Sequence, residues 1–148
     1  MQIKLRRTPK RYFFDTHRAL TPVETLRQVE TLTDKVGITG IEDITGRDKL
    51  NIPVYSAYRP GAKAGAVSVH TGKGLTGDQA RVSVLMEAIE RYSAEIKEED
   101  RAKFHFESYN EGNRAKKVEP SSLILSALSN VTPDSKIEWC EGYDLMTE

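Results

Sequence analysis

The chain contains a single cysteine, Cys140, and only three histidines, which lie far apart at His17, His70 and His105. This scarcity excludes a disulfide framework and leaves no zinc-binding spacing of cysteine and histidine. An excess of either charge is also missing, because 22 Lys and Arg balance 22 Asp and Glu. A neutral chain lacks the general positive charge of a non-specific nucleic-acid binder, so we expect no nucleic-acid partner and only local anion sites.

Long apolar runs are absent as well. The chain has no stretch of about 18 apolar residues, the length that a membrane-spanning helix needs. The basic segment Met1–Arg11 also lacks the apolar run of a signal peptide. We therefore expect a cytoplasmic protein without membrane contact. The length of 148 residues fits one domain, and the hydrophobic share of 38% predicts that this domain is folded but rather polar.

A capping-box pattern predicts the first helix. The run Thr21–Glu24 combines an N-cap hydroxyl, a proline at the first helical position and a glutamate at the third. Apolar residues then recur at helical spacing as far as Gly37, which supplies a stop. The pattern predicts a helix over 22–36.

A second capping pattern, Thr76 with Gln79, opens the longest predicted helix, over 77–98. The segment before it, Thr71–Gly74, is glycine-rich, and we predict a flexible loop there. The helix itself keeps the 3.6-residue period through Val82, Leu85, Met86, Ile89 and Ile96.

Alternating residues predict several short strands, and the region around 120–128 reads as a short helix or loop. We expect the last strand to be unpaired, because the chain stops soon after it. The resulting fold class is α+β, with short antiparallel strands packed against the two helices. The predicted strands cover residues 38–44, 52–58, 67–70, 104–109 and 136–145.

The junction of the glycine-rich segment and the long helix carries the candidate chemistry. At 100° per residue, Glu87 and Glu90 share one stripe with Ser83, away from the apolar face. Two carboxylates three residues apart can point jointly at Mg²⁺, which favours hard oxygen ligands. The backbone N–H groups of Gly72–Gly74 and the helix N-terminus would face an anion, and Lys73 would add a positive charge. The pattern predicts a phosphate and metal site.

Other interpretations of these residues stay open. Glu87 and Arg91 are four residues apart, so the stripe could equally be a solvated face with weak ion pairs. The glycine-rich segment is not a P-loop, because Val67 and Gly74 stand where that motif needs Gly and Ser or Thr. Gly72, Gly74 and Gly77 have the Rossmann spacing, but no acidic residue follows on a suitable strand.

Taken in order, the motifs of the chain resemble the N-terminal part of the YcaO family, over about residues 12–148. The resemblance rests on several motifs in the correct order, which are more specific together than any one alone. These motifs are Thr16–Leu26, Gly37–Thr39, Thr45–Asp48 with Ile52–Val54 and Arg59-Pro60, Gly72–Gly74 with Ala80–Ser83, Glu87–Arg91, and Trp139–Leu145.

The resemblance implies an enzyme that uses ATP and Mg²⁺ to activate a backbone amide of a peptide or protein substrate. A side chain or an external sulfide adds to the amide carbonyl, the resulting oxygen is phosphorylated, and phosphate departs. The product is an azoline ring or a thioamide, and the sequence does not choose between them. Phosphate leaves far more readily than hydroxide, so positioning and charge neutralisation are the protein's main tasks.

The resemblance also assigns roles to particular residues, although it identifies no catalytic one. Glu87 and Glu90 are implied to bind Mg²⁺, and Lys73 and Ser83 to lie beside the nucleotide. Arg18 and Thr25, seven residues apart, are implied to contact phosphate. From the residues alone, Arg18 could equally be an ordinary surface arginine, and Thr25 a helix hydroxyl that bonds its own backbone.

Length separates this chain from the family, since the resemblance covers only the first part of a YcaO domain. We therefore expect 1–148 to be an N-terminal portion, truncated at its C-terminus, whose catalysis is incomplete alone. Expected partners are the peptide or protein substrate, a companion protein or the missing C-terminal part, and a second copy in a homodimer. The alternative is a non-catalytic scaffold module that recruits a peptide or partner through an open edge at 137–145.

Overall fold

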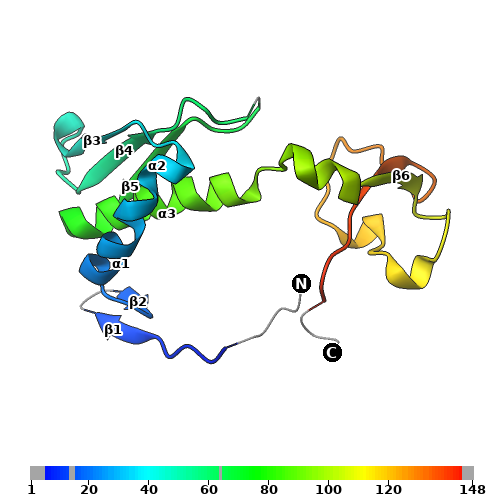
Figure 1. Cartoon of the computed structure of the whole chain (residues 1–148), viewed down its shortest axis with the longest axis horizontal. Helices are drawn as coiled ribbons and strands as arrows, with labels where there is room; N and C mark the ends of the chain where they lie inside the picture. Colours follow the sequence, from blue (N-terminus) through cyan, green and yellow to red (C-terminus); the bar gives the residue numbers. More distant parts are fainter. Residues whose placement is uncertain (1–5, 14–15, 64, 145–148) are drawn as a thin grey trace. The chain divides into compact units, whose positions relative to one another are not determined.

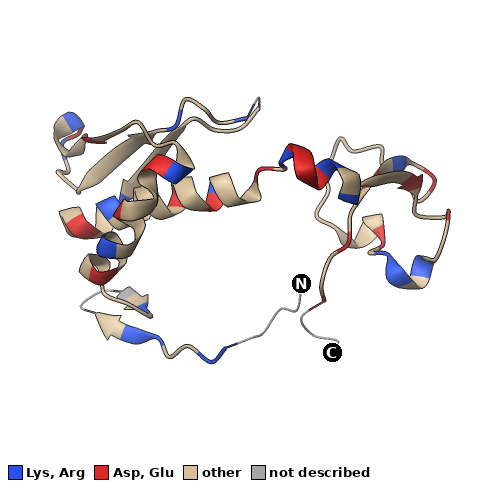
Figure 2. Ribbon diagram, viewed as in Figure 1, with Lys and Arg blue, Asp and Glu red and all other residues tan. Residues whose placement is uncertain are grey.

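The computed structural model describes residues 6–13, 16–63 and 65–144 (Figure 1). It divides into two compact units, Met1–Glu95 (unit 1) and Ile96–Glu148 (unit 2). Unit 1 contains a three-stranded sheet with helices, and unit 2 contains a two-stranded ribbon with short 3-10 turns. The predicted α+β class with short antiparallel strands is confirmed. Charged residues of both signs are scattered over both units (Figure 2).

The first predicted helix has the expected extent, although a short 3-10 segment interrupts it. It consists of α1 (Pro22–Val29), the 3-10 helix η1 (Glu30–Leu32) and α2 (Thr33–Val36). The capping box is confirmed: the Glu24 N–H donates to the Thr21 hydroxyl at 3.2 Å, and the Thr21 N–H donates to the Glu24 carboxylate at 2.8 Å. Gly37 ends the run at φ 80°, a left-handed conformation that favours glycine.

The sheet of unit 1 is antiparallel, with strand order β3-β4-β5. Its strands are β3 (Gly40–Asp43), β4 (Val54–Tyr58) and β5 (Val69–Lys73), and the 3-10 helix η2 (Thr45–Arg47) follows β3. The sequence predicted the first two strands with slightly wider bounds. A small ribbon of β1 (Arg11–Phe13) and β2 (Thr16–Arg18), which the sequence did not predict, precedes α1.

The predicted flexible loop over Thr71–Gly74 is wrong, because β5 continues to Lys73 and the Gly74 N–H donates to the carbonyl of Pro53 at 3.2 Å. The glycine at position 72 serves a close approach instead of flexibility. A Cβ at Gly72 would lie 2.2 Å from the backbone nitrogen of Val84 and 2.4 Å from the carbonyl oxygen of Ala80. The strand therefore packs against the helix at a distance that only glycine permits.

The long helix α3 spans Gly77–Ala94, and the Thr76 hydroxyl caps it by accepting from the Gln79 N–H at 3.3 Å. The prediction that it continues to residue 98 is wrong. Its end at Glu95 coincides with a buried ion pair, since the Glu95 carboxylate accepts from the guanidinium of Arg59, which is 1% exposed. Arg59 also lies over the ring of Tyr92, at 5.6 Å from its centroid.

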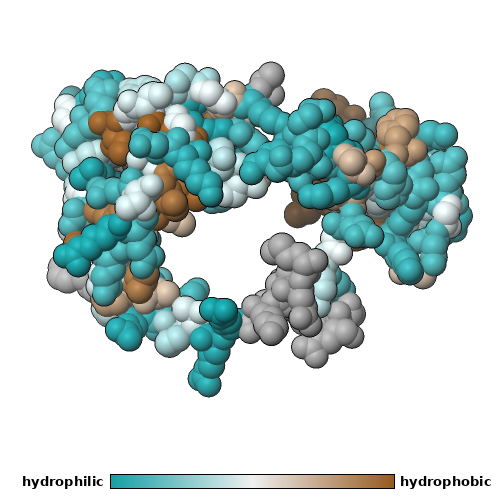
Figure 3. All heavy atoms as spheres, viewed as in Figure 1, coloured by the Kyte–Doolittle hydropathy of each residue, from teal (hydrophilic) through white to brown (hydrophobic). Residues whose placement is uncertain are grey.

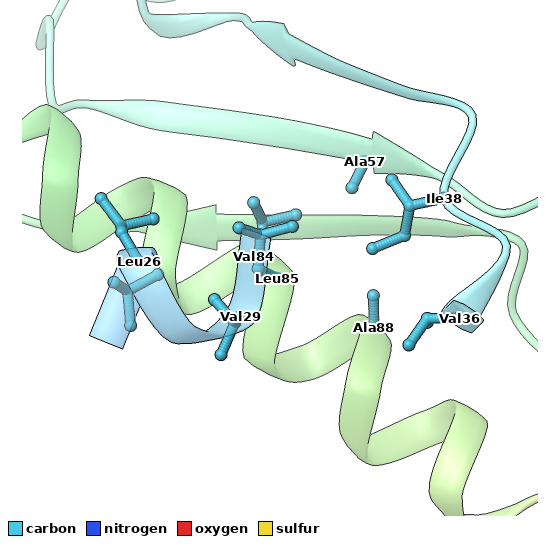
Figure 4. Packing of buried hydrophobic residues seen from close by; sticks show 9 residues of the cluster. Leu26, Val29, Val36, Ile38, Ala57, Val84, Leu85 and Ala88 are labelled. Atoms are coloured by element: carbon cyan, nitrogen blue, oxygen red, sulfur yellow. The ribbon is translucent and has the colours of Figure 1, made fainter. Parts of the chain in front are cut away.

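The core of unit 1 forms where α3 is held between the sheet and the first helical run (Figure 4). Full burial of a Val, Leu or Ile side chain contributes about 1.5–3 kcal/mol to the free energy of unfolding. Because α3 packs on two sides, Val84 is fully buried although the predicted apolar face omits it, whereas the predicted Met86 is exposed. The cluster comprises Leu26, Val29, Val36, Ile38, Ala57, Val82, Val84, Leu85 and Ala88.

Unit 2 pairs its two strands, so the predicted unpaired final strand is wrong. β6 (His105–Ser108) and β7 (Lys136–Trp139) form an antiparallel ribbon, and residue 145 lies outside the described residues. The expected strand over 136–145 lacks a partner strand beyond Trp139 in the described part. The remaining regular segments are the 3-10 helices η3 (Glu98–Lys103), η4 (Arg114–Lys116) and η5 (Pro120–Ser122).

Lys117 contacts several segments of unit 2. The Lys117 ammonium is 2.6 Å from the Glu107 carboxylate, donates to the Ser108 carbonyl at 2.8 Å and lies 5.1 Å from the ring centroid of Trp139. The hydrogen bond from Lys117 to the Glu107 carboxylate is the main reason why the pKa of Glu107 is lowered from its ordinary value. Apolar side chains are largely exposed here, including Ile124 and Leu128, and hydrophobic atoms are visible on the surface of this unit (Figure 3).

We expect Gly72→Ala to destabilise the protein by about 1–3 kcal/mol or more, because its Cβ would collide with the backbone of α3. The matched control is Gly46→Ala, since a Cβ at Gly46 would meet nothing within 4 Å. Urea denaturation of both variants measures the difference. Equal stability of the two variants would contradict the close packing of β5 on α3.

We expect Arg59→Met to destabilise unit 1 by about 3 kcal/mol, because it leaves the largely buried carboxylate of Glu95 without its charged partner. The control Arg47→Met removes an ion pair with Glu42 in which both side chains are well exposed, so it should cost about 1 kcal/mol or less. Thermal unfolding of both variants compares them. The double variant Arg59→Met, Glu95→Met should recover part of the loss.

Candidate functional site

The carboxylates predicted to bind a metal lie on one accessible stripe of α3. Glu87 is half-buried, with its side chain 35% exposed, and Glu90 is exposed one turn further along. Ser83, four residues before Glu87, is half-buried on the same stripe. Ala80 and Val84, which lie against the backbone of Gly72, mark the side of the helix that packs on the sheet. The helix thus presents two carboxylates beside the outer strand β5.

Glu87 contacts one buried and one exposed side chain. Its Oε1 lies 3.5 Å from the Nδ1 of His70, which is fully buried, and 3.6 Å from the Nε of Arg91, which is 52% exposed. The surface ion pair that the sequence left open therefore exists, although its length and exposure make it weak. The histidine contact is one that the sequence analysis missed.

His70 belongs to β5, where it pairs with Ala57 and shares a face with Gly72. Strand alternation could have placed it on the buried face, if β5 had been extended through the glycines. None of the described residues forms a hydrogen bond with either ring nitrogen. Buried polar atoms without partners are rare in folded proteins, so this imidazole calls for an explanation.

Lys73 is not brought to this stripe. Because side chains alternate along a strand, Thr71 and Lys73 lie on the face of the sheet that α3 does not cover, and both are exposed. Of the backbone N–H groups of Gly72–Gly74 that were predicted to face an anion, that of Gly74 donates instead to the carbonyl of Pro53. The positive charge and the two carboxylates therefore occupy different faces of the sheet–helix layer.

Arg18 and Thr25 lie on β2 and α1. The Thr25 hydroxyl donates to the carbonyl of Thr21 at 2.9 Å, which is the local bond that the sequence left open for it. Arg18 is half-buried, and its buried Nε has no hydrogen-bond partner among the described residues. An unpaired guanidinium N–H is free to donate to an anion.

The donor set on α3 matches the chemistry of Mg²⁺. In the described part of the chain, no group of three or more His, Cys, Asp or Glu residues could surround a metal ion. Glu87 and Glu90 therefore offer a two-carboxylate set. Mg²⁺ commonly takes one or two carboxylates and completes its shell with phosphate oxygens and water. The residues fit a metal that binds together with a nucleotide.

Comparisons with known families and proteins agree with this chemistry. Residues 71–148 match the family described as YcaO cyclodehydratase, ATP- and Mg²⁺-binding. The chain is 42% identical over 127 residues to an uncharacterized protein of Methanothermobacter thermautotrophicus, covering 86% of this chain and 31% of that protein. It is 34% identical over 135 residues to a Rhizobium leguminosarum bv. trifolii protein from the tfuA 3' region, covering 88% and 30%.

A solved structure is similar over almost the whole chain. It is that of YcaO from Methanopyrus kandleri bound with AMPPCP and Mg²⁺, with a TM-score of 0.61, 34% identity, and coverage of 95% of this chain and 34% of that one. The chain thus spans about a third of the length of the relatives that it matches. Among the described residues, no helix is long and apolar enough to span a bilayer.

Proposed function

The chain belongs to the YcaO family of ATP- and Mg²⁺-binding cyclodehydratases, and on this premise we propose that it contributes a nucleotide and metal site to the activation of a peptide backbone amide. The observation that carries the proposal is the placement of Glu87 and Glu90 on one accessible stripe of α3. This stripe lies inside the residues that match the family, and a relative of the same fold binds AMPPCP and Mg²⁺.

Each candidate residue has a role in this proposal. Glu87 and Glu90 hold Mg²⁺ through their carboxylate oxygens, and the hydroxyl of Ser83, one turn earlier, lies beside the nucleotide. The Nε–H of Arg18, which has no hydrogen-bond partner among the described residues, donates to phosphate. The hydroxyl of Thr25 donates to phosphate after giving up its bond to the carbonyl of Thr21. Lys73 lies on the other face of the sheet, so it does not contact the nucleotide and acts on it only through its charge, at longer range than the carboxylates.

The chemistry follows from leaving-group ability. A nucleophile adds to the amide carbonyl, and the oxygen that results would leave only as hydroxide. Bound ATP supplies the phosphoryl group that converts this oxygen into a good leaving group. The residues of the chain hold the phosphates in position and neutralise their charge, which are the main demands of phosphoryl transfer. Both an azoline and a thioamide are consistent with this step.

The chain supplies only part of this site. Two carboxylates fill two positions of a metal shell that phosphate oxygens, water and further protein ligands complete. Because the chain spans about a third of its relatives, we propose that the substrate-binding and remaining metal-binding groups come from further YcaO sequence, from a companion protein or from a second copy in a homodimer.

A non-catalytic scaffold is less well supported. That alternative relied on an open edge at 137–145, and β7, which among the described residues is paired with β6 on one side only, still offers such an edge. The residues of α3 rather than the strand therefore decide between the two functions. The accessible carboxylates on α3 have no role in a module that only recruits a partner. The function that the geometry supports best is therefore nucleotide-dependent chemistry.

We expect Mg²⁺ and ATP together, at about 100 times the dissociation constant, to raise the unfolding midpoint by several degrees, because a ligand that binds only the folded state adds about 2.7 kcal/mol. Glu87→Gln with Glu90→Gln should abolish this increase, because amides bind Mg²⁺ weakly. The measurement is a thermal melt with metal, with nucleotide and with both.

The matched control is Glu98→Gln with Glu99→Gln, which removes the same charge from exposed positions of η3. This control should keep the full response. An unchanged response in the Glu87 and Glu90 variant would contradict the metal site, and the absence of any response in the unaltered chain would favour the scaffold.

A further inference from the structure

We propose that His70 is a positioning residue for Glu87: the imidazole Nδ1–H holds one carboxylate oxygen of Glu87 and directs the other to the metal. This inference rests on the proposed role of Glu87 as a metal ligand. The observation that supports the inference is a contact of 3.5 Å between His70 Nδ1 and Glu87 Oε1. The imidazole that makes this contact is fully buried.

The location of His70 restricts its choice of partner. It lies in β5, opposite Ala57 and two residues before Gly72, on the face that packs against α3. The close approach of strand and helix at Gly72 brings the imidazole to the side of α3 that carries Glu87. Its ring is inaccessible to water, so its polar atoms depend on protein partners.

The hydrogen-bonding needs of His70 favour Glu87 as its partner. A neutral imidazole carries one N–H, and no described residue forms a hydrogen bond with either ring nitrogen. The Glu87 carboxylate is the acidic group in reach, at a distance of 3.5 Å. A small rotation of Glu87 shortens this separation to the usual N–H···O range of about 2.7–3.2 Å. With the proton on Nδ1, the buried N–H has the Glu87 carboxylate as its acceptor. A buried N–H without an acceptor costs more than a buried ring nitrogen without a donor.

The consequence for the metal site is one of orientation. The contact of Oε1 with Arg91 is long and exposed, so the hydrogen bond to the buried His70 is what restrains the Glu87 carboxylate. The second oxygen of Glu87, Oε2, is then left to bind the metal together with Glu90. Partners of this kind orient the groups that bind a metal, and their loss typically weakens metal affinity about 10- to 100-fold.

The test uses two substitutions of His70 in the 148-residue chain. His70→Phe keeps an aromatic ring but removes the donor, whereas His70→Asn places an amide N–H near the position of Nδ1. We expect His70→Phe to weaken Mg²⁺ binding in the presence of AMPPCP about 10- to 100-fold by titration calorimetry, and His70→Asn to recover most of it. AMPPCP titrated without metal should bind both variants as it binds the unaltered chain.

The control is Ser56→Ala. Ser56 is buried on the neighbouring strand, and its hydroxyl donates to the backbone carbonyl of His70 at 3.3 Å. The substitution perturbs the surroundings of the histidine without touching the carboxylate of Glu87. We expect its Mg²⁺ affinity to equal that of the unaltered chain, which separates positioning from general loosening of β5.

A second measurement does not require a folded His70 variant. Nitrogen-15 NMR of the imidazole rings in the unaltered chain should show one histidine with its proton on Nδ1, and Glu87→Gln should shift that signal. The other two histidines, His17 and His105, are exposed and serve as internal references.

The outcomes distinguish this inference from the proposed function. If Glu87→Gln abolishes Mg²⁺ binding while His70→Phe binds as the unaltered chain does, the positioning role is overturned and the metal site stands. If Glu87→Gln itself has no effect, both are overturned. A proton on Nε2 of the buried histidine would also overturn the positioning role.

Discussion

The close approach of β5 to α3 at Gly72 is the constraint on which the rest of unit 1 depends. Backbone atoms of the helix occupy the space that a side chain would need there. This approach buries Ala80, Val84 and Ala88 against the sheet, and it sets the register that turns His70 toward Glu87. The same alternation sends Lys73 to the opposite face. One packing contact therefore decides both where the core lies and which charged groups can act together.

Local signals predicted the parts of the fold that depend on neighbours in sequence. The helix start at Thr21 and its stop at Gly37 were predictable because caps and left-handed glycines act within one turn. The stripe of Glu87 and Glu90 followed from helical geometry. The candidate metal ligands could thus be placed on one face from sequence, although their assignment to Mg²⁺ stays a prediction.

Tertiary contacts decided what the sequence could not predict. The glycines of the segment Thr71–Gly74 are compatible with a flexible loop and equally with a strand that packs tightly on a helix, as Gly72 does. The helix end at Glu95 coincides with the buried charge of Arg59, 36 residues earlier, and the pairing of β7 with β6 joins segments about 30 residues apart. The contact between His70 and Glu87 was also unpredictable, because it joins a strand to a helix and a histidine in an alternating run does not indicate its neighbour.

The central claim, that α3 carries the metal of a nucleotide site, can be tested most directly by paramagnetic broadening. Mn²⁺ added with AMPPCP to the nitrogen-15-labelled chain broadens amide signals near the bound ion. The account predicts that the loss centres on α3 between Ser83 and Arg91 and that excess Mg²⁺ reverses it. Broadening centred instead on the acidic η3 segment, Glu98–Lys103, with α3 unaffected, would contradict it.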